Sequence, residues 1–134
     1  YFFDEQVALA TRFDLPLIIH SVQATEDVSD LLKSYSKSRG VIHAYSGTLQ
    51  EAKILMKMDF LFGFSHNLSN PHAYKLHDIV KFLPLESILI ETDDHKNSDE
   101  LIQVAERVAR IKKITVDQVI EQCDQNVCKL FNLA

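Results

Sequence analysis

Short apolar runs alternate with longer amphipathic segments along the whole sequence, and this alternation limits the folds that the chain can adopt. Four runs have the length and composition of β-strands: residues 15–20, 40–45, 60–64 and 88–93. Their nearly continuous apolar character is typical of strands that are covered on both faces. Because helical patterns separate the runs, we expect parallel strands joined by right-handed crossovers.

The segments around these strands have apolar residues at helical spacing. Helices are predicted over residues 2–13, 24–37, 70–82, 98–112 and 115–132, with a further helix starting at residue 48. Three helix-start signals support them: the capping boxes of Thr48 with Glu51 and of Thr115 with Gln118, and the Asn70-Pro71 pair. We expect residues 1–134 to form a single α/β domain.

Two architectures fit this order of elements, an open doubly wound sheet and a section of a (β/α)8 barrel. The chain has only three glycines, Gly40, Gly47 and Gly63, and they do not form a glycine-rich phosphate loop. The lack of such a loop disfavours a dinucleotide-binding or P-loop protein.

Composition and charge narrow the class of protein further. The formal net charge of −5 argues against a broad nucleic-acid-binding surface, although bound cations can supply the positive charge that a nuclease needs. No apolar run approaches the ~20 residues of a membrane span, so no membrane partner is expected. Cys123 and Cys128 are five apart on a predicted helix and therefore lie on different faces. They are expected to be free thiols of a reduced, cytoplasmic protein.

Three of the predicted strands end in a side chain that can bind a metal ion. His20 ends the first strand, His43 lies near the end of the second, and Asp93 ends the fourth. In α/β barrels the side chains at the carboxyl ends of the strands converge on the active site. Imidazole and carboxylate groups are common ligands of Zn²⁺ and other divalent metals. A lone histidine is usually structural, but three such residues at equivalent positions predict a metal site.

The fourth strand carries a second carboxylate on the same face. Side chains alternate along a strand, so Leu89, Glu91 and Asp93 share one face and Glu91 lies one layer below Asp93. A buried carboxylate needs partners. Glu91 is therefore expected either to orient the metal ligands or to pair with a cation, and the alternative is an exposed glutamate at the sheet edge.

Three motifs in this order resemble one known family. They are Leu-Pro-Leu-Ile-Ile-His-Ser at 15–21, Gly-Val-Ile-His-Ala-Tyr-Ser-Gly at 40–47 and Ile-Leu-Ile-Glu-Thr-Asp at 88–93. With Gln6, Leu9-Ala10 and the segment from Asn126 to Phe131, they make essentially the whole chain similar to the TatD-type metal-dependent deoxyribonucleases, which belong to the amidohydrolase-like barrel group.

The resemblance implies an architecture: half of a (β/α)8 TIM-type barrel, with four parallel βα units corresponding to strands five to eight, and a C-terminal helix. The family's other metal ligands, a His-x-His pair on strand one and a Glu on strand four, would precede this chain. The chain also does not begin with Met, so we expect residues upstream. The expected partner is the missing N-terminal half or a second copy, because in an open half barrel Ile18, Val41, Phe62 and Leu89 would meet water.

The resemblance also implies a chemistry. His20, His43 and Asp93 would bind a divalent metal such as Mg²⁺, Zn²⁺ or Mn²⁺, and Asp93 would also be the catalytic carboxylate. A metal-bound water would attack a phosphodiester, in DNA or in another substrate. Candidate substrate-binding residues close to the strand ends are Ser46, His66 and His95, whereas Val22 stands where the family commonly has an arginine.

Two other functions fit the same sequence. One is a degenerate half barrel that binds a partner and catalyses nothing. The other is a metal-dependent hydrolase of non-nucleic substrates, because one fold supports many activities.

Overall fold

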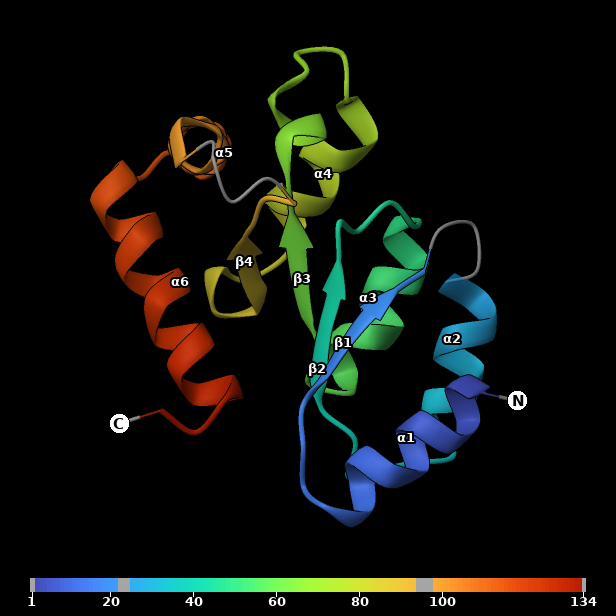
Figure 1. Ribbon diagram of the computed structural model, residues 1–134. Coiled ribbons are helices and arrows are strands. Elements are labelled where there is room, and N and C mark those ends of the chain that lie inside the picture. The colour runs from blue at the N-terminus through green and yellow to red at the C-terminus, as the bar shows by residue number, and fades with distance from the viewer. Residues whose placement is uncertain (1, 22–24, 94–97, 134) are drawn as a thin grey trace.

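The computed structural model describes residues 2–21, 25–93 and 98–133. Within them, four parallel strands form one sheet in the order β1-β2-β3-β4 (Figure 1). The strands are β1 (Leu17–His20), β2 (Gly40–His43), β3 (Leu61–Phe64) and β4 (Ile88–Ile90). The prediction of a parallel α/β fold is therefore confirmed.

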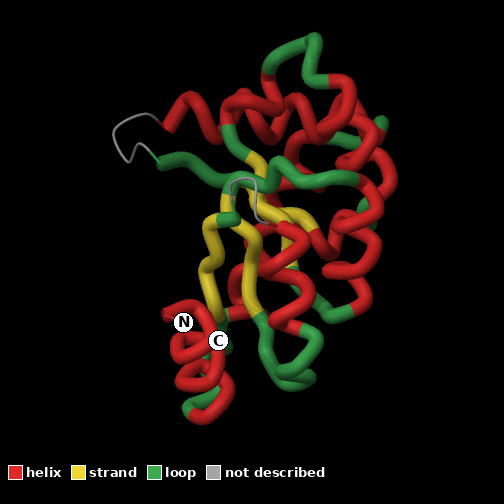
Figure 2. The backbone as a smooth tube through the Cα atoms, turned by 90° about the vertical axis from the view of Figure 1, so that its right-hand side faces the viewer, coloured by secondary structure: helices red, strands yellow, loops and turns green. Residues whose placement is uncertain are grey.

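Helices precede, connect and follow the strands, and the turned view of Figure 2 shows them packed alongside the sheet. They are α1 (Phe2–Arg12), α2 (Thr25–Leu32), α3 (Leu49–Lys57), α4 (Tyr74–Phe82), α5 (Ser98–Lys112) and α6 (Val116–Leu130), with the short 3-10 helices η1 (His66–Ser69) and η2 (Leu85–Ser87). Both predicted capping boxes are present, at Thr48 and at Thr115. No described helix is long and apolar enough to cross a membrane.

One face of the sheet is buried beneath the helices. Every second strand residue points to this face: Ile19, Ile42, Phe62, Phe64 and Ile88. These side chains pack against apolar residues from all six described helices. Burying one such side chain contributes about 1.5–3 kcal/mol, so this face holds the fold together.

The opposite face is more covered than the open half barrel predicts. Val41 and Leu89 are buried there against Leu130 at the end of α6. Phe62 was expected on this face with Val41 and Leu89, but it points to the helical face. The alternation of side chains along β3 is therefore shifted by one residue from the prediction. Of the four residues expected to meet water, only Ile18 does, with 60% of its surface exposed.

Three element boundaries differ from the predictions for local reasons. The helix predicted to start at Pro71 begins at Tyr74, because the Asn70 side chain accepts a hydrogen bond from the His72 amide in a tight turn instead of capping a helix. Helix α2 ends at Leu32, where the chain tightens into i to i+3 hydrogen bonds. Strand β4 ends at Ile90, although the Glu91 amide still donates to Phe64.

Buried polar contacts dock α6 against the start of β4. The Asn126 side-chain amide donates to the carbonyls of Leu85 (3.0 Å) and Ile88 (2.8 Å). The Cys123 thiol also contacts the Ile88 carbonyl. Burial of the thiol raises the pKa of Cys123 to about 11. Cys123 and Cys128 are both free, as predicted.

We predict that Asn126→Ala destabilises the fold. Two side-chain hydrogen bonds to backbone carbonyls would be lost, each contributing about 0.5–1.5 kcal/mol. We expect urea denaturation to show a free energy of unfolding lower by about 2 kcal/mol. Gln125→Ala, at an exposed position on the same helix, is the control and should change it little. Equal effects of the two substitutions would show that Asn126 does not dock the helix.

Candidate metal centre

The register of the first two strands places two imidazoles side by side. His20 on β1 pairs with His43 on β2, at the carboxyl end of both strands. Their ring centroids are 4.3 Å apart. His20 is exposed, whereas the His43 side chain is 10% exposed. Both rings lie on the face opposite the helical core, since each follows one residue after a core isoleucine.

Asp93 reaches the same place from the segment after β4. Its Oδ1 lies 2.8 Å from Nε2 of His43, and its side chain is 78% exposed. The structure therefore brings His43 into contact with both other predicted ligands. Among the described residues, however, no group of three His, Cys, Asp or Glu side chains forms a ready-made metal cage.

Glu91 holds the other side of the His43 ring. Its Oε1 lies 2.9 Å from Nδ1 of His43 and also accepts a hydrogen bond from the backbone amide of Ala44. The side chain is 17% exposed, so Glu91 is not an exposed glutamate at the sheet edge. The two ring nitrogens of His43 thus each face a carboxylate, Nδ1 that of Glu91 and Nε2 that of Asp93.

The backbone around Glu91 is shaped to admit its carboxylate. A Cβ at Gly63 on β3 would collide with the carboxyl group of Glu91, so only glycine leaves the space. Ala44 has a positive φ of 47°, which turns its amide toward Glu91. A non-glycine residue at positive φ is uncommon and costs of order 1 kcal/mol or more. The chain thus accepts local strain where the carboxylate binds.

Comparison with known proteins identifies the family. Residues 1–132 match the model of the TatD related DNase family. The chain belongs to this family. It is 32% identical to the metal-dependent hydrolase YabD of Bacillus subtilis, over 98% of this chain and 56% of that protein. It is 31% identical to the human deoxyribonuclease TATDN3, over 94% of this chain and 48% of that protein.

A solved structure supports the same assignment. The TatD homologue YjjV of Escherichia coli superposes with a TM-score of 0.86 at 28% identity, over 98% of this chain and 55% of that chain. A TatD family hydrolase of Entamoeba histolytica, with a TM-score of 0.80 and 18% identity, shares the fold. The chain spans about half the length of these relatives.

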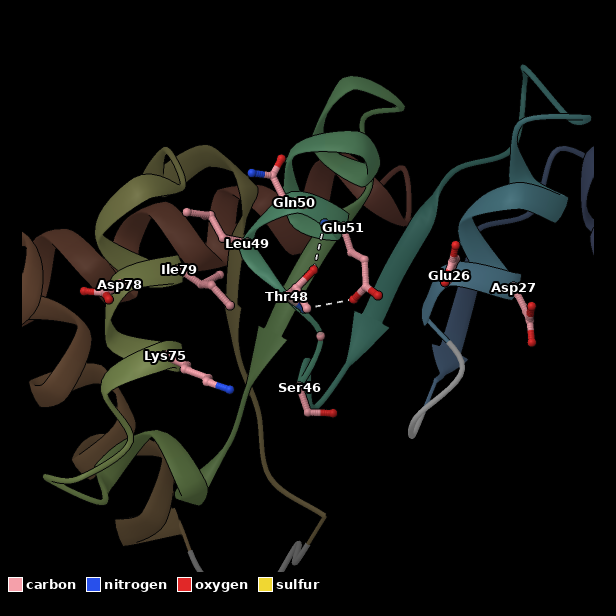
Figure 3. Close-up of a pocket in the computed structure, with 11 residues that line it drawn as sticks. Glu26, Asp27, Ser46, Thr48, Leu49, Gln50, Glu51, Lys75, Asp78 and Ile79 are labelled. Carbon is pink, nitrogen blue, oxygen red and sulfur yellow. Dashed lines mark hydrogen bonds between the residues drawn. The ribbon is translucent and has the colours of Figure 1, made fainter.

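The predicted substrate-binding residues of this TatD chain lie in different places. Ser46 is exposed on the loop after β2 and lines a cavity of about 700 Å³ between that loop, α2 and α4. Figure 3 shows Lys75 on one side of this cavity and the carboxylates of Glu26 and Asp27 on the other. His66 is exposed at the start of η1. His95 and Val22 lie outside the described residues.

Sequence reasoning missed one residue close to these strand ends. Glu100, in the first turn of α5, accepts a hydrogen bond from the Thr92 hydroxyl and lies 3.3 Å from Nδ1 of His66. An acidic residue in the first turn of a helix is usually explained by the helix dipole. The position of Glu100 in the first turn of a predicted helix is the only sequence signal, and it does not by itself indicate a functional residue.

We predict an energetic coupling between Gly63 and Glu91. Gly63→Ala should destabilise the fold by about 1–3 kcal/mol, because the new methyl group meets a packed carboxylate. Glu91→Ala should also destabilise, because it leaves the Ala44 amide and His43 without their acceptor. The double variant should lose less than the sum of the two losses, since Glu91→Ala removes the collision. Urea denaturation of all four proteins measures the coupling, and additive losses would contradict the packing described here.

Proposed function

We propose that this chain carries half of the catalytic centre of a TatD-type metal-dependent deoxyribonuclease. One observation carries the proposal: the nearly buried His43 imidazole lies between the carboxylates of Glu91 and Asp93, with His20 against its ring. These contacts bring His20, His43 and Asp93 to one place, and their side chains are ligand types that a divalent cation accepts.

The relatives support an architecture for the complete protein. We propose that residues 1–134 form one domain that corresponds to strands five to eight of a (β/α)8 barrel. The parallel order β1 to β4 and the match to about half of each relative support this. The remaining metal ligands would then come from the other half of the barrel. The two free thiols are consistent with a reducing, cytoplasmic location.

The chain's own residues would divide the chemistry between them. When bound, a divalent ion such as Mg²⁺, Zn²⁺ or Mn²⁺ supplies a nucleophile at neutral pH and neutralises charge on the phosphoryl oxygens. Glu91 lies at Nδ1 of the His43 ring and would hold the ring so that Nε2, beside Asp93, faces the ion. Asp93 is exposed enough to reach water, so it can hold the attacking water and accept its proton.

Substrate contacts are assigned to residues around the strand ends. We propose that Ser46, His66 and His95 contact the phosphodiester. The name of the human relative supports DNA as the substrate. Acidic residues line the cavity beside Ser46, so a bound cation would have to offset their repulsion of a polyanionic substrate.

A binding module without catalysis is the second candidate function. It is favoured by one observation, the lack of a complete three-residue metal group among the described residues. The two candidates differ in whether the complete protein cleaves DNA in a reaction that depends on these metal ligands.

We predict that metal binding by the full-length protein depends on these ligands. Asp93→Asn and His43→Ala should each weaken Mn²⁺ affinity by at least about 10–100-fold. That is the loss seen when a residue that only hydrogen-bonds to a metal ligand is removed. DNA cleavage should fall with it. Asp124→Asn and His72→Ala change exposed residues elsewhere and serve as matched controls. Unchanged Mn²⁺ affinity in both ligand variants, measured by calorimetry, would rule out this site.

We predict that the isolated 134-residue chain has little or no nuclease activity and associates with itself. A two-metal centre needs more ligands than three. Several apolar side chains on α1, on the loop after it and on β1 are also exposed: Leu9, Phe13, Leu15 and Ile18. Exposed strand edges and apolar patches are association sites.

Nuclease assays and sedimentation measure the two parts of this prediction. Metal-dependent cleavage that is abolished by Asp93→Asn would show that the isolated chain is a sufficient enzyme. A monomer that unfolds cooperatively and binds no ANS would show that the exposed surface needs no partner.

A further inference from the structure

Glu100 connects the segments that follow two neighbouring strands. One carboxylate oxygen accepts from the hydroxyl of Thr92, which lies between Glu91 and Asp93 after β4. The other lies 3.3 Å from Nδ1 of His66, which follows β3. The Glu100 side chain is 18% exposed. Holding a carboxylate in such a place costs desolvation, which its two partners offset.

The surrounding contacts fix this arrangement in space. Phe64 pairs with Ile90, so the chain segments that follow β3 and β4 leave the sheet side by side. Farther along α5, Arg107 donates to the Ser69 carbonyl at the end of η1 (3.0 Å). Helix α5 therefore contacts η1 at the first residue of η1, through Glu100, and at the last, through Arg107. The contact of Glu100 is the one beside the metal centre.

The contact also determines which His66 nitrogen is free. Glu100 lies in ion-pair contact with Nδ1 of His66, so Nδ1 is the nitrogen that the carboxylate occupies. Nε2 is then left for another group, on a side chain that is 74% exposed. Because His66 leaves the sheet beside the segment that carries Asp93, this nitrogen belongs to the rim of the candidate metal centre.

We propose that Glu100 is a positioning residue: it fixes Thr92, and through it the segment that carries Asp93, and it holds His66 with Nε2 turned toward a phosphodiester oxygen of the substrate. This rests on the proposed function for its substrate class. The contacts of Glu100 themselves do not depend on that function. A purely structural Glu100 would stabilise α5 without setting the state of the His66 ring.

The test uses ¹⁵N-edited NMR of the histidine rings and of the Thr92 amide in the full-length protein. Glu100→Ala should shift both the His66 ring ¹⁵N resonances and the Thr92 amide resonance, because both groups lose their carboxylate partner. Glu100→Gln keeps the volume and has one acceptor oxygen, so it should lose at least one of the two signatures. Asp99→Asn, at the exposed neighbouring carboxylate, is the matched control and should keep both.

The substrate contact is tested with dimethyl phosphate, a minimal phosphodiester. Its titration should move the His66 ring resonances saturably in the unsubstituted chain and in Asp99→Asn, with affinity at least about 5-fold weaker in Glu100→Ala, a loss that corresponds to about 1 kcal/mol. If both Glu100 variants keep the ring state of His66 and the Thr92 resonance, the positioning role is wrong. If dimethyl phosphate never moves His66, the substrate contact is wrong. Neither readout requires a bound metal, so failure of the metal proposal would be seen separately.

Discussion

The carboxylate of Glu91 is the group on which the candidate metal centre depends. It reaches from the end of β4 across Gly63 on β3 and binds both the Ala44 amide and the His43 ring after β2. A charge in this position is tolerated only because it is paired and hydrogen-bonded. The same contact fixes one orientation of the His43 imidazole. The ends of three strands are thus held together by one side chain, and that side chain also directs Nε2 toward Asp93.

The sequence alone could predict the parts of this arrangement that follow from periodicity. Parallel strands of similar length bring their carboxyl ends to one edge, so His20, His43 and Asp93 were expected to lie together. In the structure these three residues lie together, because His20 pairs with His43 in the sheet and Asp93 contacts His43. The capping boxes were equally predictable, because they depend on residues only three positions apart.

What could not be predicted depends on how separate elements pack. The need for glycine at position 63 comes from a carboxylate on the adjacent strand, and the contacts of Glu100 come from the way α5 docks against η1. The burial of Val41 and Leu89 likewise comes from Leu130, some forty residues or more away in the sequence. None of these contacts has a local sequence signal. Each becomes visible only when the sheet register and the helix docking are known.

The central claim is that His43, fixed by Glu91, presents Nε2 to a divalent cation shared with His20 and Asp93. Anomalous scattering from crystals of the full-length protein soaked with Zn²⁺ tests it most directly. We expect an anomalous peak in contact with Nε2 of His43, the His20 ring and the Asp93 carboxylate, while Glu91 remains on Nδ1. A peak bound through Nδ1 of His43, or zinc bound only at other residues, would contradict it.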